Sequence, residues 1–213
     1  MGLFSFLRSS QPSYTDKVWK TGEFCVKGLM TDALHEVKSH QVPVIAAFFK
    51  EGQQRLVDFL NGHQIPYHHI HSSNLHEASR ATEVIVLIDS ACMRPGDIGQ
   101  VITHLPATTK KISILGHYPL PTKESAVMEK ILLSRTFEII FYSALDDACL
   151  KLFNGQRILE LMEKLGMKDE EPIEHSMVAK SMERARNKIQ AQVKFEKEAD
   201  SEETWFAKNV PNL

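Results

Sequence analysis

Four histidines lie within a short stretch of the chain: His68, His69, His71 and His76. If residues 67–71 form a strand, His69 and His71 point to the same face of it, because side chains alternate along a strand. Two such imidazoles could bind Zn²⁺ or Ni²⁺, with His76 or Glu77 as a third ligand. No spaced cysteines and no second His-x-His pair accompany them, so solvated histidines are the competing interpretation. We therefore predict no bound metal and keep His69, His71 and His76 as the candidate ligands.

Other polar residues near the middle of the chain could act as nucleophiles or bind an anion. Asp89, Ser90 and His117 have the residue types of a hydrolase triad, but no Gly-x-Ser-x-Gly turn presents the serine. Without a positioned histidine, we interpret Cys92 as an unreactive thiol. The basic residues of this region could form a small anion-binding site, or they could be solvated surface charges. The residues of such an anion site would be Arg94, Lys110, Lys111 and His117.

These residues follow segments that have the pattern of buried strands. The five predicted strands are residues 42–49, 67–71, 83–89, 111–116 and 137–142. Segments with helical spacing of apolar residues separate them, which predicts an α/β fold with a parallel sheet and, through right-handed crossovers, helices on both faces. Ligands of such folds usually bind at the carboxyl ends of the strands. The residues that we expect at that edge are Lys50, Glu51, Ser72, Ser73, Asp89, Ser90, Gly116 and His117.

Composition argues against several classes of function. The 213 residues include 25 Lys and Arg and 27 Asp and Glu, and the net charge of −2 argues against a nucleic-acid partner. The three cysteines are far apart, which indicates free thiols and a cytoplasmic protein. No apolar run is long enough to span a membrane. The apolar residues near the start could provide at most a peripheral membrane contact.

The C-terminal part of the chain has a helical pattern and no further strand. Apolar residues recur at steps of three and four, which predicts a long amphipathic helix. The residues of this stripe are Val178, Met182, Ala185, Ile189 and Val193. The acidic end is expected to be a loop, and its Trp205 and Phe206 either dock on the chain's own surface or bind a partner. We predict that the stripe and these two aromatic residues bind another protein or a second copy of the chain.

The stretch from Phe141 to Ile189 also carries a longer pattern. It contains FYSALDDACLKLF, then QRILELMEKLGM, then PIEHSMVAKSMERARNKI. These segments resemble the end of the second nucleotide-binding domain of SecA, the motor ATPase of bacterial preprotein translocation, and the start of its helical scaffold. The segment QVPVIAAF and the pairs Ile65-Pro66 and His76-Glu77 resemble SecA more weakly. In all, the resemblance covers roughly residues 29–190.

The resemblance implies a division of the chain into four parts. Residues 29–145 would form a RecA-like domain, which is the α/β fold of P-loop NTPases. Residues 146–198 would form a helical extension similar to the start of the SecA scaffold. An N-terminal segment at 1–28 and an acidic tail at 199–213 would flank these two parts.

The segments that handle phosphate depart from SecA. The chain has no Gly-x-x-x-x-Gly-Lys-Ser/Thr loop, and LGHYPLPTKES replaces the family's arginine-rich segment. The resemblance leaves Asp97 as a remnant of a second-domain motif and Arg94 as a displaced arginine. Together with Ser90 and His117, they are the candidate residues for residual ATP or ADP binding.

We therefore expect a pseudo-ATPase, with no catalytic residues and no required cofactor. The expected function is that of a non-catalytic interaction or scaffold module, and the resemblance implies the translocation machinery as its partner. The alternative is a regulatory accessory subunit that binds nucleotide without hydrolysing it.

Overall fold

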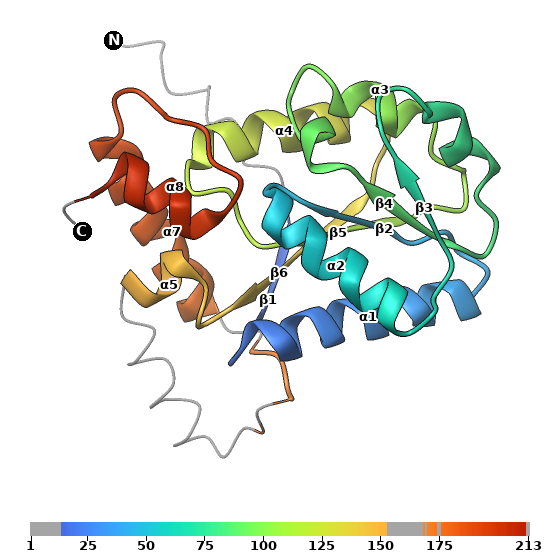
Figure 1. The fold of residues 1–213 in the computed structure, drawn as a ribbon, viewed down its shortest axis with the longest axis horizontal. Helices are drawn as coiled ribbons and strands as arrows, with labels where there is room; N and C mark the ends of the chain where they lie inside the picture. The colour runs from blue at the N-terminus through green and yellow to red at the C-terminus, as the bar shows by residue number, and fades with distance from the viewer. Residues whose placement is uncertain (1–13, 153–167, 169, 174–175, 212–213) are drawn as a thin grey trace, which may run out of the picture.

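The computed structural model describes residues 14–152, 168, 170–173 and 176–211, and its six strands form one parallel sheet (Figure 1). The strands are β1 (Thr15–Trp19), β2 (Val44–Ala47), β3 (Tyr67–Ile70), β4 (Ile85–Ile88), β5 (Lys111–Leu115) and β6 (Glu138–Ala144). Their order across the sheet is β1-β6-β5-β2-β4-β3, and every neighbouring pair runs parallel. This confirms the predicted α/β fold class, and all five predicted strands belong to the sheet.

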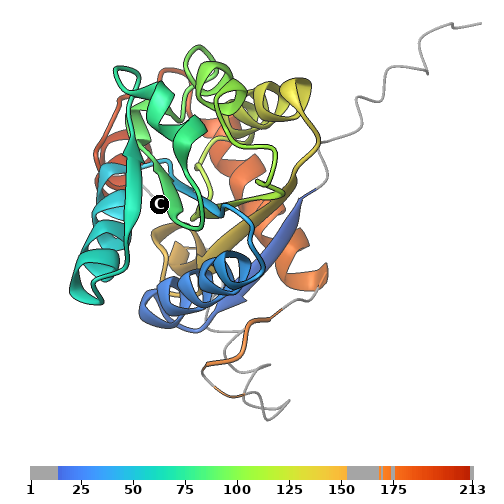
Figure 2. The same cartoon turned by 90° about the vertical axis from the view of Figure 1, so that its right-hand side faces the viewer.

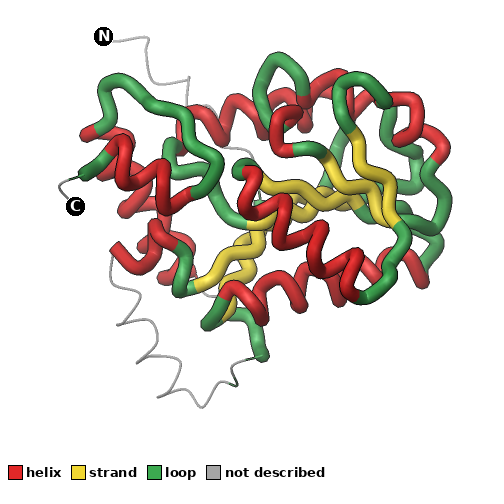
Figure 3. The backbone as a smooth tube through the Cα atoms, in the orientation of Figure 1, coloured by secondary structure: helices red, strands yellow, loops and turns green. Residues whose placement is uncertain are grey.

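Helices cover both faces of the sheet, as right-handed crossovers require (Figures 1 and 3). On one face lie α1 (Gly22–Lys38) and α2 (Lys50–Gly62). On the other lie the 3₁₀ helix η1 (Leu75–Arg80), α3 (Ile98–Thr103) and α4 (Pro121–Ser134). Because the inner strands are buried on both faces, they consist of continuous apolar residues, and this is the pattern that revealed them in the sequence.

β1 is an edge strand that no apolar run marks. It pairs with β6, from Thr15 beside Ile140 to Trp19 beside Ala144 (Figure 2). Of its five residues, only Val18 and Trp19 are buried. The N-terminal segment expected at residues 1–28 therefore contributes a strand to the sheet, and its expected boundary lies inside α1. The other two boundaries stay predictions.

Three helices from the C-terminal part gather at the carboxyl end of the strands (Figure 1). They are α5 (Ala148–Leu152), α7 (Ser176–Gln192) and α8 (Glu202–Asn209). The stripe predicted on α7 is real, but it faces the rest of the chain: Val178, Met182, Ala185 and Ile189 are 0–4% exposed. Val193 is partly buried beside them. The helix that the sequence indicates at 156–166 lies outside the described residues.

The acidic end of the chain forms a helix where a loop was expected. The Ser201 side chain caps α8 by accepting a hydrogen bond from the Thr204 backbone N–H at 3.1 Å. Trp205 is fully buried and Phe206 is 6% exposed, so both aromatic residues dock on the chain's own surface. Together with the α7 stripe, they are therefore not an exposed partner-binding surface in this fold. None of the helices in the described part of the chain has both the length and the apolar composition to cross a bilayer.

Candidate functional site

The sheet changes its winding direction between β2 and β5. The chain leaves β2 toward β3 on one side, whereas it leaves β5 toward β6 on the other. In open parallel sheets, such a switch point forms a crevice beyond the carboxyl ends of the strands. A pocket of about 520 Å³ lies at this position. The segments that follow β2, β4 and β5 line it with Phe49, Lys50, Ser90, Arg94, Tyr118 and Lys123.

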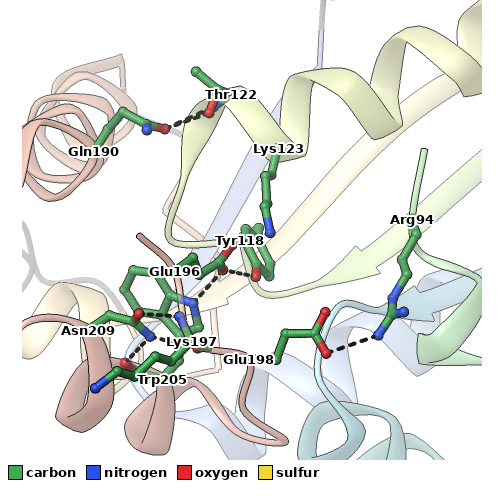
Figure 4. Close-up of polar contacts among 10 residues, drawn as sticks. All are labelled: Arg94, Tyr118, Thr122, Lys123, Gln190, Glu196, Lys197, Glu198, Trp205 and Asn209. Atoms are coloured by element: carbon green, nitrogen blue, oxygen red, sulfur yellow. Dashed lines mark hydrogen bonds and ion pairs between the residues drawn. The ribbon is translucent and has the colours of Figure 1, made fainter. Parts of the chain in front are cut away.

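The segment between α7 and α8, residues 193–201, passes over this pocket, and we call it the strap. Three of its alternate residues are acidic: Glu196, Glu198 and Asp200. Each pairs with a cation of the pocket wall (Figure 4 shows the first two pairs). Glu196 pairs with Lys123, Glu198 pairs with Arg94 at 3.5 Å, and Asp200 pairs with Lys50 at 2.8 Å. Three cations of the pocket wall are therefore paired with strap carboxylates, while a fourth lining cation, Lys208, donates to the Glu198 backbone carbonyl at 3.1 Å.

The strap also covers the first turn of α2. A helix N-terminus at the switch point is the usual place for a phosphate, because its free N–H groups and the helix dipole attract anions. Here the Glu51 backbone N–H donates to the backbone carbonyl of Asp200 at 3.0 Å. A hydrogen bond to Asp200 raises the pKa of Lys50, and the same contact lowers the pKa of Asp200. The strap thus occupies the place that a phosphate would take.

Two aromatic side chains fix one end of the strap. The Tyr118 hydroxyl and the Trp205 indole N–H both donate to the same carboxylate oxygen of Glu196 (Figure 4). Burial alone would raise the pKa of Glu196, but hydrogen bonds from Lys123, Tyr118 and Trp205 hold it below its ordinary value. Phe49 stacks on Tyr118 with ring centroids 5.5 Å apart. The Glu196 end of the strap is therefore anchored in an apolar, hydrogen-bonded corner.

A buried charge network lies next to the pocket and joins α7 to the sheet. The His117 ring nitrogens face two carboxylates, with Nε2 2.9 Å from Asp16 and Nδ1 3.0 Å from Glu124. Arg186 of α7 pairs with Glu124 at 2.7 Å and donates to the Tyr118 carbonyl at 3.0 Å. The charged side chains of this network are 5–10% exposed. The network is a largely buried structural connection between α7 and the sheet, and its His117 also lines a neighbouring crevice.

The partners within this network shift one another's pKa. Burial and the charge of Arg186 would lower the pKa of His117, but the charge of Glu124 and hydrogen bonds to Asp16 and Glu124 raise it above its ordinary value. Burial alone would raise the pKa of Glu124, whereas the charges of His117 and Arg186 and a backbone hydrogen bond lower it. Both shifts favour a charged pair in the folded protein.

The structure brings together two of the four residues that the sequence suggested for nucleotide binding. Ser90 and Arg94 line the switch-point pocket. His117 does not, because it is enclosed in the buried network. Asp97 is exposed at the start of α3 and lies outside the pocket lining. The sequence analysis expected Lys50 at the strand ends but did not assign it to an anion site, and it lines the pocket. Sequence reasoning missed Lys123, which also lines the pocket and whose only signal was its place in the first turn of a helix.

The other chemistry considered from the sequence is not assembled. Asp89 faces two histidines of the β3 end, and His117 faces Asp16 and Glu124, so the suggested hydrolase triad does not form. Lys110 and Lys111 lie at the opposite end of β5 from the pocket. Cys92 is buried, and burial raises the pKa of its thiol, which agrees with an unreactive cysteine.

A second crevice, of about 360 Å³, holds two neighbouring carboxyl groups that the sequence analysis did not single out. Asp147 accepts a hydrogen bond from the Ala144 backbone N–H at 2.7 Å, and Glu202 of α8 accepts one from Ala148 at 3.0 Å. Burial raises the pKa of Asp147 to about 6 and that of Glu202 to about 8. The charge of Asp146 raises the pKa of Asp147 further, and the charge of Asp147 does the same for Glu202. The start of α8 therefore docks through a carboxyl group that favours its protonated form.

The histidine cluster forms a different group from the one expected. His69 Nε2 and His71 Nδ1 lie 3.2 and 3.1 Å from the same carboxylate oxygen of Asp89. His76 is exposed on η1 and is not part of the cluster. Burial, and then the neighbouring His71, lower the pKa of His69. The third potential ligand is thus Asp89, at the end of the adjacent strand β4, and not His76 or Glu77.

The parallel sheet and its switch-point pocket make this an α/β protein, a class whose ligands usually bind beyond the carboxyl ends of the strands. Comparison with known proteins then gives its relatives. No family model matches the chain. A segment of 55 residues is 47% identical to the protein translocase subunit SecA of Chlorobium phaeobacteroides (strain BS1), and it covers 26% of this chain and 5% of that protein. The SecA subunit of Sorangium cellulosum (strain So ce56) is 48% identical over 50 residues, which cover 24% of this chain and 5% of the relative.

A third relative agrees with these two. The SecA subunit of Solidesulfovibrio magneticus is 49% identical over 51 residues, which cover 24% of this chain and 6% of that protein. The matched part of the chain therefore spans only about one-twentieth of the length of these curated relatives. Over about a quarter of its length, the chain is related in sequence to the SecA family.

Proposed function

We propose that this chain is a non-catalytic module related to SecA, and that it takes part in protein translocation by binding another protein. The relatives that match part of it are named protein translocase subunits, which supports the link to translocation. The observation that carries the non-catalytic half of the proposal is the strap, because it fills the position at which this fold class binds phosphate.

Three features of the pocket support this interpretation. The first turn of α2 already donates to a strap carbonyl, and the nearby cations Lys50, Arg94 and Lys123 are each paired with a strap carboxylate. The link from β2 to α2 is Phe48-Phe49, which offers no glycine backbone for a phosphate to approach. The chain has no Gly-x-x-x-x-Gly-Lys-Ser/Thr sequence. Phosphoryl transfer depends on positioned charges at these places.

The interaction half of the proposal requires a surface other than the α7 stripe. In the described residues, two large apolar side chains are well exposed: Leu133 is 77% exposed and Phe195 is 91% exposed. The test is cross-linking of the untagged chain in its native cell, followed by identification of the attached proteins. We expect translocase subunits among them. Their absence, under conditions where a known translocase pair is captured, would contradict the link to translocation.

The pocket itself favours a second candidate, a regulatory subunit that binds nucleotide once the strap has moved. Calorimetry with Mg-ATP and Mg-ADP separates the two candidates. The protein would be compared with a Glu198→Gln/Asp200→Asn variant, which frees Arg94 and Lys50, and with Glu129→Gln on the exposed side of α4 as the control. The non-catalytic interaction module binds nucleotide in none of the three. Binding by the strap variant alone would establish the second candidate, and turnover of ATP by the unaltered chain would contradict both.

A further inference from the structure

We propose that His69, His71 and Asp89 bind one divalent transition-metal ion, with Zn²⁺ as the natural occupant. The three side chains come from the carboxyl ends of the adjacent strands β3 and β4. One ligand atom from each lies within 4.8 Å of the other two. Two imidazoles and one carboxylate are a donor set that zinc and related ions accept. The proposal is independent of the strap and of any link to translocation.

The distances match those between the ligands of a tetrahedral ion. Ligand atoms about 2.0–2.2 Å from a tetrahedral zinc lie about 3.3–3.6 Å from each other. The Asp89 Oδ2 atom is 3.2 Å from His69 Nε2 and 3.1 Å from His71 Nδ1. Small side-chain adjustments would therefore bring the three atoms to an ion that lies between them.

The backbone holds the ligands in place before any ion arrives. The Asn74 side chain bridges the end of β3, since its oxygen accepts from the His71 N–H at 2.7 Å and its nitrogen donates to the His69 carbonyl at 2.9 Å. Asp89 Oδ1 accepts from the Ala91 N–H at 2.9 Å. This leaves Oδ2 directed toward the two histidines. Such outer hydrogen bonds fix the orientation of metal ligands in proteins.

Gln53 of α2 shows that the histidine presents a lone pair to this position. The Gln53 amide oxygen accepts from the Ser90 N–H at 2.6 Å, which orients its nitrogen toward His69 Nε2 at 3.0 Å and Asp89 Oδ2 at 3.2 Å. An amide nitrogen only donates, so a hydrogen bond from Gln53 requires the tautomer in which His69 Nε2 accepts. Two acceptor atoms, one of them a carboxylate oxygen, thus face each other, and a cation between them would satisfy both. The Gln53 amide nitrogen would turn away when the ion binds.

Exposure leaves room for a further ligand. The side chains of His69 and Asp89 are 27% and 18% exposed, and that of His71 is 45% exposed. A site with three protein ligands and an open side keeps one position for water or another small donor. The Gln53 side chain already contacts His69 Nε2 and Asp89 Oδ2, so Gln53→Glu would add a fourth ligand, an oxygen.

Cobalt titration of the untagged chain tests the proposal, because four-coordinate Co²⁺ absorbs visible light strongly. We expect one Co²⁺ per chain, displaced by Zn²⁺, with affinity reduced at least tenfold in His71→Ala and in Asp89→Asn. His76→Ala removes an exposed histidine outside the cluster and should leave the titration unchanged. Gln53→Glu should bind more tightly than the unaltered chain.

Circular dichroism of each variant separates loss of the site from loss of the fold, and the half-exposed His71 is the substitution least able to disturb packing. The proposal is overturned if the unaltered chain shows no visible cobalt bands at a tenfold excess of the ion. It is equally overturned if a folded His71→Ala titrates like the unaltered chain, or if His76→Ala loses binding to the same extent.

Discussion

Two sets of ion pairs attach the C-terminal part of the chain to the sheet, and they differ in burial. On α7, the side chains of Arg186 and Glu124 are each 5% exposed and approach to 2.7 Å. At the strap, the side chains of Arg94 and Glu198 are 60% and 76% exposed and lie 3.5 Å apart. A buried charge that loses its partner is costly, whereas water and salt screen an exposed pair. The comparison indicates that α7 is a fixed part of the fold and that the strap is the attachment another molecule could displace.

The burial of the strap and the number of its contacts decrease along its length, from Glu196 toward α8. The Glu196 side chain is 9% exposed and is held by Lys123, Tyr118 and Trp205. The side chains of Glu198 and Asp200 are 76% and 77% exposed, and each pairs with a single cation. Displacement is therefore expected to begin at the acidic residues nearest α8 and over the first turn of α2. That is the part of the strap that covers the phosphate position.

The largest expected effect is that of Arg186→Met, which removes the cation of the buried network. Glu124 would keep His117 but lose its second partner, so the free energy of unfolding should fall by about 3–5 kcal/mol. Urea denaturation measures this loss. Arg184→Met, an exposed position two residues away on the same helix, should change the free energy of unfolding by less than about 0.5 kcal/mol. Equal losses in the two variants would remove the distinction between a buried and an exposed attachment.

An intermediate effect is expected from pH, through the carboxyl group that begins α8. The pKa of Glu202 is about 8 in the folded protein, above its ordinary value of 4.5. Because the folded state holds this proton more tightly, the contribution of Glu202 to stability is complete below pH 4.5 and is lost as the pH rises through about 8. Between pH 5 and 9, we expect a loss of roughly 2 kcal/mol, since the half-buried group and its coupling to Asp147 reduce the full value.

Glu202→Gln isolates this pH dependence. The amide oxygen can still accept from the Ala148 N–H but cannot ionise, so the fall in stability between pH 5 and 9 should be smaller in this variant than in the unaltered chain. The matched control is Glu203→Gln, which changes an exposed neighbour on the same helix. Urea denaturation at both pH values gives the difference. If the two variants keep the same pH dependence, the docking of α8 does not depend on the proton of Glu202.

The sequence was sufficient for the inner sheet but not for the contacts that make the sites. β2 and β4 are buried on both faces, so their apolar runs were visible without any knowledge of the fold. β1 has polar residues in three of its five positions and could be recognised only from its pairing with β6. A local sequence pattern identifies a strand when burial on both faces requires apolar residues. An edge strand is less buried, so its composition is less constrained and its pattern is weaker.

The candidate sites depend on contacts between residues far apart in the chain. His69 and His71 were candidates from the sequence, but their partner Asp89 follows a strand whose position beside β3 no local spacing reveals. Likewise, Arg94 and Glu198 are 104 residues apart, so the strap could not be foreseen from the acidic composition of the tail. The amphipathic stripe on α7 was predicted correctly as a pattern. Its direction was not, because periodicity cannot say whether an apolar face meets the same chain or another.

The smallest effect, and the one that tests the strap most directly, is expected at Arg94 and Glu198. An exposed pair of this kind contributes about 0.2–1 kcal/mol, and moderate salt screens it further. Arg94→Met and Glu198→Gln, alone and together, form a double-mutant cycle in which the coupling energy is the part that the single substitutions do not explain. We expect a coupling below about 1 kcal/mol by urea denaturation at low salt, smaller still at high salt. Either single substitution should also speed proteolytic cleavage within residues 193–201, while the cleavage elsewhere is unchanged. A coupling as large as the loss in Arg186→Met would mean that the strap is as fixed as α7, and a ligand could then reach the first turn of α2 only by unfolding the C-terminal part of the chain.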